Sequence, residues 1–116
     1  MIQLSPNMRV FLHVEPIDFR NGIDGLAGAC RNKLKHDPMS GAAFLFINRR
    51  RTSLKILVYD GQGYWLCQKR LSCGTFRFWP RNESSFSAPQ IQVLLYNGDP
   101  AGSRMAPAWK PLPGTI

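Results

Sequence analysis

The chain has 116 residues, the length of one ordinary domain and too short for two independent cores. Hydrophobic residues make up 44% of it, so a packed interior is expected, and no apolar run is long enough to predict a membrane-spanning helix. Fifteen Lys and Arg against seven Asp and Glu give a net charge of +8, which favours an anionic partner: DNA, RNA or an acidic protein face. The N-terminus lacks the pattern of a secretory signal, so a cytoplasmic location is expected.

The first third of the chain predicts one strand and one helix. Residues 9–14 (RVFLHV) are apolar and β-branched enough to form a strand. Apolar side chains then recur at helical spacing and predict an amphipathic helix over about 21–35 that ends before Pro38. The stripe predicted to face the core consists of Ile23, Leu26, Ala27, Cys30 and Leu34.

Four further apolar runs predict an antiparallel meander. They span residues 42–47, 54–59, 64–71 and 76–80. The last three are joined by DGQG and SCGT, whose Asp and Gly residues are typical of hairpin turns. A continuous apolar run such as AAFLFI indicates a buried central strand.

The C-terminal part predicts a short helix and a tail. Ser87 is a candidate N-cap, Pro89 suits the first turn, and Gly98 is a candidate stop signal. Residues 100–116 carry four prolines without periodicity and are expected to form an extended or disordered tail. The predicted fold class is α+β: a single domain over 1–99, with an antiparallel meander of about four to five strands, one main helix packed on a face and a short C-terminal helix.

A cluster of cations is predicted at one end of this sheet. Antiparallel counting across DGQG sets Ser53 opposite Arg70, and counting across SCGT sets Arg70 opposite Arg77. Six cations then gather there: Arg49, Arg50, Arg51, Lys69, Arg70 and Arg77. Like charges opposite each other are destabilising, so the cluster is expected to bind a polyanion or an acidic partner. The alternative is a loop whose arginines are only solvated.

Aromatic residues on the same strands allow two interpretations. Trp65, Trp79, Tyr64 and Phe78 are suited to stack on nucleic-acid bases. Such residues more often fill a core, and that is expected of at least half of them.

No motif in the sequence predicts catalysis, a metal or a cofactor. Asp18 and Asp24 are the candidate acids for a metal-dependent nuclease, but both flank a helix start, where acids complement the helix dipole, and a capping role is favoured. Cys30, Cys67 and Cys73 lack the close spacing of zinc ligands.

Three segments, read in order, resemble one protein family. They are DFRNGIDGLAGAC, DPMSGAAFLFINRRRTSLKILVYDGQGYWLCQKRLSCGTFRFWP and SAPQIQVLLYNGD, which together cover about residues 9–99. The chain is similar to the small accessory protein TnpB of the IS 66 group of bacterial insertion sequences, which is distinct from the RNA-guided nuclease of the same name.

The resemblance implies an accessory role in transposition, with catalysis in a separate, larger transposase. The family's basic NRRRT and KRL stretches map onto Asn48–Thr52 and Lys69–Leu71. The leading hypothesis is a non-catalytic factor whose basic edge binds DNA at the element ends and helps assemble the transposase complex. The alternative is a protein-interaction module that docks an acidic surface of the transposase, or of its small companion protein, without contacting DNA.

Overall fold

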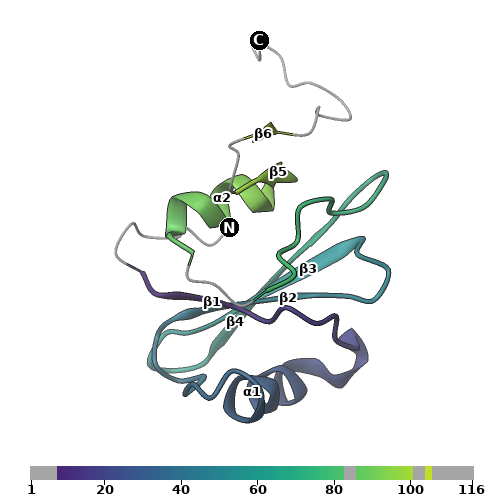
Figure 1. Ribbon diagram of the computed structural model, residues 1–116. Coiled ribbons are helices and arrows are strands. Elements are labelled where there is room, and N and C mark those ends of the chain that lie inside the picture. Colours follow the sequence, from purple (N-terminus) through teal and green to yellow (C-terminus); the bar gives the residue numbers. More distant parts are fainter. Residues whose placement is uncertain (1–7, 83–85, 101–103, 106–116) are drawn as a thin grey trace.

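A computed structural model describes residues 8–82, 86–100 and 104–105 of the chain (Figure 1). Its elements in chain order are β1 (Val10–Leu12), the 3₁₀ helix η1 (Phe19–Asn21), α1 (Gly22–Asn32), β2 (Ala43–Ile47), β3 (Ser53–Tyr59), β4 (Tyr64–Arg70), α2 (Ala88–Leu95), β5 (Gly98–Asp99) and β6 (Arg104–Met105). Among the described residues, no helix is both long enough and apolar enough to cross a membrane.

The main sheet has four strands in the order β1-β2-β3-β4. β2, β3 and β4 form the predicted antiparallel meander, and Ser53 lies opposite Arg70 as predicted. β1 instead pairs parallel to β2, with Val10 opposite Ala43, so the sheet is mixed. A parallel pair requires a crossover connection, which α1 provides. The α+β class is therefore confirmed, while the wholly antiparallel sheet is wrong.

α1 and α2 lie on opposite faces of this sheet (Figure 1), and a hydrophobic core fills the space on each face. α1 packs on one face through Leu26, Ala27 and Cys30, the centre of its predicted stripe. α2 packs on the other face through Ile91 and Leu94. All five residues of β2 are buried, because the strand is covered on both faces, as its continuous apolar sequence predicts.

Residues 76–80 do not form the predicted fourth strand of the meander. Arg77 therefore does not lie opposite Arg70 in a ladder. Phe76 and Trp79, three residues apart, are the buried side chains of this segment, which is not the alternation of a strand. The Phe76 N–H donates to the Arg51 carbonyl oxygen (2.8 Å), and the Trp79 indole N–H donates to the Val14 carbonyl oxygen (2.9 Å). The segment thus crosses the end of the sheet as a strap.

α2 begins as the sequence predicts, and its stop signal stands one residue before the predicted Gly98. Ser87 and Gln90 form a reciprocal capping box, and a proline stands in the first turn. At the other end Asn97, rather than Gly98, takes the left-handed conformation (φ 58°). The Asn97 side chain accepts from the Arg77 N–H and donates to the Thr75 carbonyl oxygen, which ties the strap to the end of α2.

Part of the predicted tail is ordered in the structure. β6 pairs antiparallel with β5, with Asp99 opposite Arg104. The expectation of an extended or disordered chain for 101–103 and 106–116 lies outside the described residues.

Candidate functional site

The loop between β2 and β3 carries Arg49, Arg50 and Arg51 on a fixed backbone. The Asn48 side-chain oxygen accepts from the backbone N–H groups of Thr52 (2.9 Å) and Ser53 (3.1 Å). The Asn48 side-chain nitrogen donates to the Thr52 hydroxyl (3.1 Å), and the Arg51 N–H donates to the Asn48 carbonyl oxygen (3.1 Å). Because Asn48 forms hydrogen bonds to the loop backbone from inside the loop, the backbone is fixed before any ligand binds, and the three arginines project from it.

Arg51 has a left-handed backbone, with φ 59°. This conformation costs roughly 1–2 kcal/mol in a residue with a Cβ atom, and glycine or asparagine ordinarily occupies it. An arginine at this position is therefore maintained at a conformational cost, which points to a use for its side chain.

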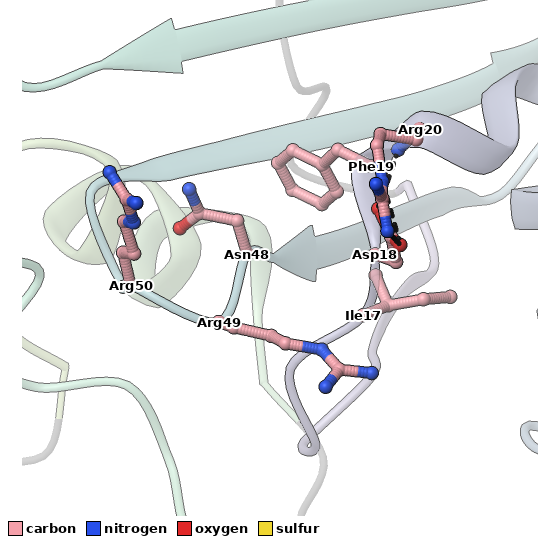
Figure 2. A pocket seen from close by; sticks show the side chains of 7 residues that line it. All are labelled: Ile17, Asp18, Phe19, Arg20, Asn48, Arg49 and Arg50. Atoms are coloured by element: carbon pink, nitrogen blue, oxygen red, sulfur yellow. Dashed lines mark hydrogen bonds and ion pairs between the residues drawn. The ribbon is translucent and has the colours of Figure 1, made fainter.

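The first hollow at this loop lies between the loop and the segment that leads into α1. It has a volume of about 690 Å³ and is lined by Ile17, Asp18, Phe19, Arg20, Asn48, Arg49 and Arg50. Figure 2 shows Arg49 extending toward the segment with Ile17 and Asp18, while Arg50 points away from it. The Ile17 N–H donates to the Ile47 carbonyl oxygen (2.9 Å), which holds this segment beside the loop.

Asp18 is the acidic residue that lines this hollow, and its carboxylate forms an ion pair with Arg20. The Arg20 guanidinium donates to both carboxylate oxygens of Asp18, with distances of 2.8–3.1 Å, and the Arg20 backbone N–H donates as well (2.9 Å). Hydrogen bonds from the side chain and backbone of Arg20, with the charges of Arg20 and Arg49, lower the pKa of Asp18 from 3.8 to about 2. The carboxylate is therefore ionised and caps η1, as its position before the helix predicts.

An Arg20→Gln variant is expected to return the pKa of Asp18 toward 3.8, because the charged hydrogen bonds to the carboxylate are lost. In the wild type, stabilisation by this pair is fully present above pH 3.8 and is lost as the pH falls through about 2. Carboxyl-carbon NMR titration of Asp18 checks both values. An unchanged pKa in Arg20→Gln would show that the pair does not form in solution.

A second hollow, of about 450 Å³, lies beside the strap. Its basic lining comes from Arg51, Arg77 and Arg81, and Glu15 is its acidic residue. Arg77 and Arg81 are exposed, while Arg51 is half-buried. The strap thus brings Arg77 to the arginine loop by a route other than the predicted strand pairing.

Five of the six predicted cations lie at this end of the molecule and present charge to solvent, and two further arginines join them. We call this set the arginine surface: Arg20, Arg49, Arg50, Arg51, Arg70, Arg77 and Arg81. Sequence counting missed Arg20 and Arg81. The adjacent Asp18 was the available signal for Arg20, and no signal in the sequence placed Arg81.

Lys69, the sixth predicted cation, is turned away from the arginine surface. Its ammonium donates to the Leu95 carbonyl oxygen at the end of α2 (2.6 Å) and lies 4.6 Å from the centre of the Tyr96 ring. Burial lowers the pKa of Lys69. Lys69 therefore caps a helix C-terminus, where a cation complements the dipole, and serves the fold.

A Lys69→Met variant is expected to lower the free energy of unfolding by about 1–2 kcal/mol, because it removes the bond to Leu95 and the contact with Tyr96. The matched Arg70→Met variant, at an exposed position next in sequence, is expected to change it by about 0.5 kcal/mol or less. Urea denaturation measures both. Equal losses would contradict the different roles assigned to the two neighbours.

The remaining chemistry-bearing residues of the described chain do not converge. Asp24 lies in the first turn of α1, and no three potential metal ligands of the described residues lie together. Cys30 is buried, and burial raises the pKa of its thiol to about 12, while Cys67 is half-buried and Cys73 exposed. Of the aromatic residues, Trp79 belongs to the core, Phe78 and Tyr64 pack at its margins, and Trp65 is 59% exposed.

The chain is thus a small α+β protein in which seven of the ten arginines lie on one surface. The profile of the family described as "IS66 Orf2 like protein" matches residues 8–102, and the chain belongs to this family of accessory proteins of insertion sequences. Its role is therefore associated with transposition.

Two proteins from Sinorhizobium fredii (strain NBRC 101917 / NGR234) are similar to most of this chain. The protein described as "Uncharacterized protein y4jC" is 33% identical over 99 residues, which cover 84% of this chain and 85% of the relative. "Uncharacterized protein y4hO" is 36% identical over 98 residues, covering 82% and 84%. No solved structure matches the chain.

Proposed function

We propose that this protein is a non-catalytic DNA-binding accessory factor, whose arginine surface contacts phosphates at the ends of an insertion sequence and helps assemble the transposase complex. The observation that carries the proposal is the loop after β2. Three successive arginines project from a backbone fixed by Asn48, and Arg51 keeps a conformation that would suit glycine better.

The chemistry of the arginine surface suits phosphates. Guanidinium groups bind phosphate oxygens in a two-pronged manner and remain charged at every accessible pH. The two hollows, lined by different parts of the residue 14–20 segment, give the surface two places for anionic groups. Phosphate contacts position a protein on a duplex without reading its sequence, so we expect little base preference.

Trp65 is the exposed residue among the four aromatic residues considered for stacking on bases, and it does not belong to this surface. The Trp65 indole donates to the Asp60 carboxylate (2.7 Å) in the turn between β3 and β4, at the other end of the two strands. Trp65 therefore does not support stacking on single-stranded bases at the arginine surface.

The test is fluorescence anisotropy of a labelled duplex carrying an element end, compared with a scrambled duplex of equal length, across several salt concentrations. We expect both to bind, with similar affinities and a logarithmic salt slope of several units. No binding to either duplex at low salt would overturn the proposal and favour docking on an acidic protein face. Mg²⁺-dependent cleavage that is lost in Asp18→Asn would overturn its non-catalytic part.

A further inference from the structure

Among the described residues, β4 pairs with β3 alone and is therefore an open edge of the main sheet. The Asp60 N–H donates to the Gly63 carbonyl oxygen and the Leu71 N–H to the Thr52 carbonyl oxygen, at the two ends of the ladder. In an antiparallel ladder, residue pairs that exchange hydrogen bonds alternate with pairs that do not. Counting inward from these two bonds along the register therefore shows which residues of β4 turn their backbone N–H and C=O groups toward β3. The outward-facing backbone groups belong to Tyr64, Leu66, Gln68 and Arg70.

Of the features that usually prevent strand addition, this edge carries charge, in Lys69 and Arg70 at one end of β4. β4 is seven residues long, contains no proline and pairs in continuous register without a bulge. Beside it, on the α2 face, lies a largely apolar hollow of about 330 Å³. Its lining includes Leu54, Ile56, Cys67, Lys69, Leu95 and Tyr96.

We propose that β4 pairs with β4 of a second copy of this chain, antiparallel, about a two-fold axis at Cys67. In this register Trp65 lies opposite Lys69 of the second copy, and Tyr64 lies opposite its Arg70. Each cation of β4 therefore lies opposite an aromatic residue of the other copy and not opposite a like charge. The Lys69 ammonium keeps its bond to Leu95, so the alkyl stem of Lys69 is the part that lies beside Trp65. The inference does not depend on the proposed DNA binding.

Charge and strand length select this register. An axis at Lys69 or Arg70 would set like charges directly opposite each other, which is destabilising. An axis at Leu66 would carry Arg70 past the end of the partner strand. With the axis at Cys67, all seven residues of β4 are paired, and every outward-facing N–H and C=O meets a partner. A two-fold interface of this kind is self-complementary, as a closed dimer requires.

The axis position makes Cys67 a specific reporter. Its backbone groups face β3, so the two Cys67 residues form a non-hydrogen-bonded pair, with Cα atoms about 4.5 Å apart. That separation lies within the range of disulfide geometry, about 4.4–6.8 Å. A mild oxidant such as diamide takes two electrons from the two thiols, which release two protons as the S–S bond forms.

The first test is crosslinking of the full chain by diamide. A Cys73→Ser variant, which retains Cys67, is expected to form a covalent dimer that dithiothreitol reverses. The matched Cys67→Ser variant, which retains the exposed Cys73, is expected to stay largely monomeric on a non-reducing gel. Crosslinking through Cys73 alone, or none through Cys67, would overturn the proposed register.

The second test is sedimentation equilibrium from low to high micromolar concentration. The wild type and Gln68→Thr are expected to dimerise, while Gln68→Pro is expected to remain monomeric. The Gln68 N–H points outward, so proline there removes a bond to the second copy and none to β3. Circular dichroism checks that Gln68→Pro keeps its fold. A monomeric wild type, or a folded Gln68→Pro that still dimerises, would contradict the dimer.

Discussion

Replacing Arg49, Arg50 and Arg51 together by alanine is expected to weaken duplex binding about 100-fold near 0.1 M salt and to reduce the logarithmic salt slope by about 2–3 units. Each arginine that neutralises a phosphate releases a counterion, so the loss of two or three contacts lowers both quantities together. The range reflects the burial of Arg51, which is half-covered while its two neighbours are exposed. Anisotropy titrations of one duplex at several salt concentrations measure affinity and slope.

A variant that removes the same charge elsewhere is the control for net charge. Arg9, Arg31 and Lys35 are exposed. Arg9 lies beside Ala43 at the start of β2, whereas the arginine loop follows Ile47 at the other end of that strand. In the control variant, Arg9 and Arg31 become alanine and Lys35 becomes asparagine, because asparagine tolerates the positive φ of residue 35. This variant is expected to lose at most several-fold in affinity. Equal losses in the two triple variants would mean that overall charge, and no particular surface, holds the DNA.

Arg51→Gly separates binding from folding. Glycine adopts the left-handed backbone of residue 51 without steric cost, so this variant is expected to gain up to about 1 kcal/mol of stability. It should still lose about one unit of salt slope if Arg51 touches a phosphate. A variant that is more stable yet binds less tightly cannot have lost affinity through unfolding.

Trp79→Ala is expected to lower the free energy of unfolding by about 3–5 kcal/mol. The Trp79 ring is 5% exposed and packs in the core on the α2 face of the sheet. Its indole N–H is also the donor that fastens the strap to Val14, so truncation removes a buried ring and a tertiary hydrogen bond together. Urea denaturation followed by far-ultraviolet circular dichroism gives the value.

Trp65→Ala is the matched control for this substitution. The Trp65 ring is 59% exposed, and its hydrogen bond to Asp60 lies at a solvated turn. Its removal is expected to cost about 1 kcal/mol or less when the protein is dilute enough to be monomeric. If the two tryptophans cost the same, the strap is not docked as described.

The parts of the fold that the sequence predicted are those fixed by local interactions. The register of β3 and β4 follows from the Asp and Gly residues of their turn, and α1 follows from the spacing of its apolar stripe. The parallel pairing of β1 and the path of 76–80 depend on partners far away in sequence. Phe76 binds the carbonyl of Arg51 and Arg77 binds the side chain of Asn97, and neither choice is visible in the segment itself.

For the arginine surface too, the sequence predicted the residues that local interactions place and missed those that depend on distant segments. Arg49 to Arg51 stand out in the sequence, and Arg70 follows from the register. Lys69 was assigned to the surface wrongly, although the alternation of a strand places it on the opposite face from Arg70. Arg20 and Arg81 join the surface only because the segment after β1 and the strap meet at one end of the sheet.

The bond between Trp79 and Val14 joins residues 65 positions apart, whereas β2, β3 and β4 are linked by short turns. Chain closure over such a separation costs more entropy than a hairpin, so the meander is expected to assemble early and the strap to dock late. During synthesis the chain therefore displays the loop with Arg49 to Arg51 before Arg77 and Arg81 are in place. The complete arginine surface is therefore expected to form after the meander, and a nascent or truncated chain is expected to present only a fraction of it.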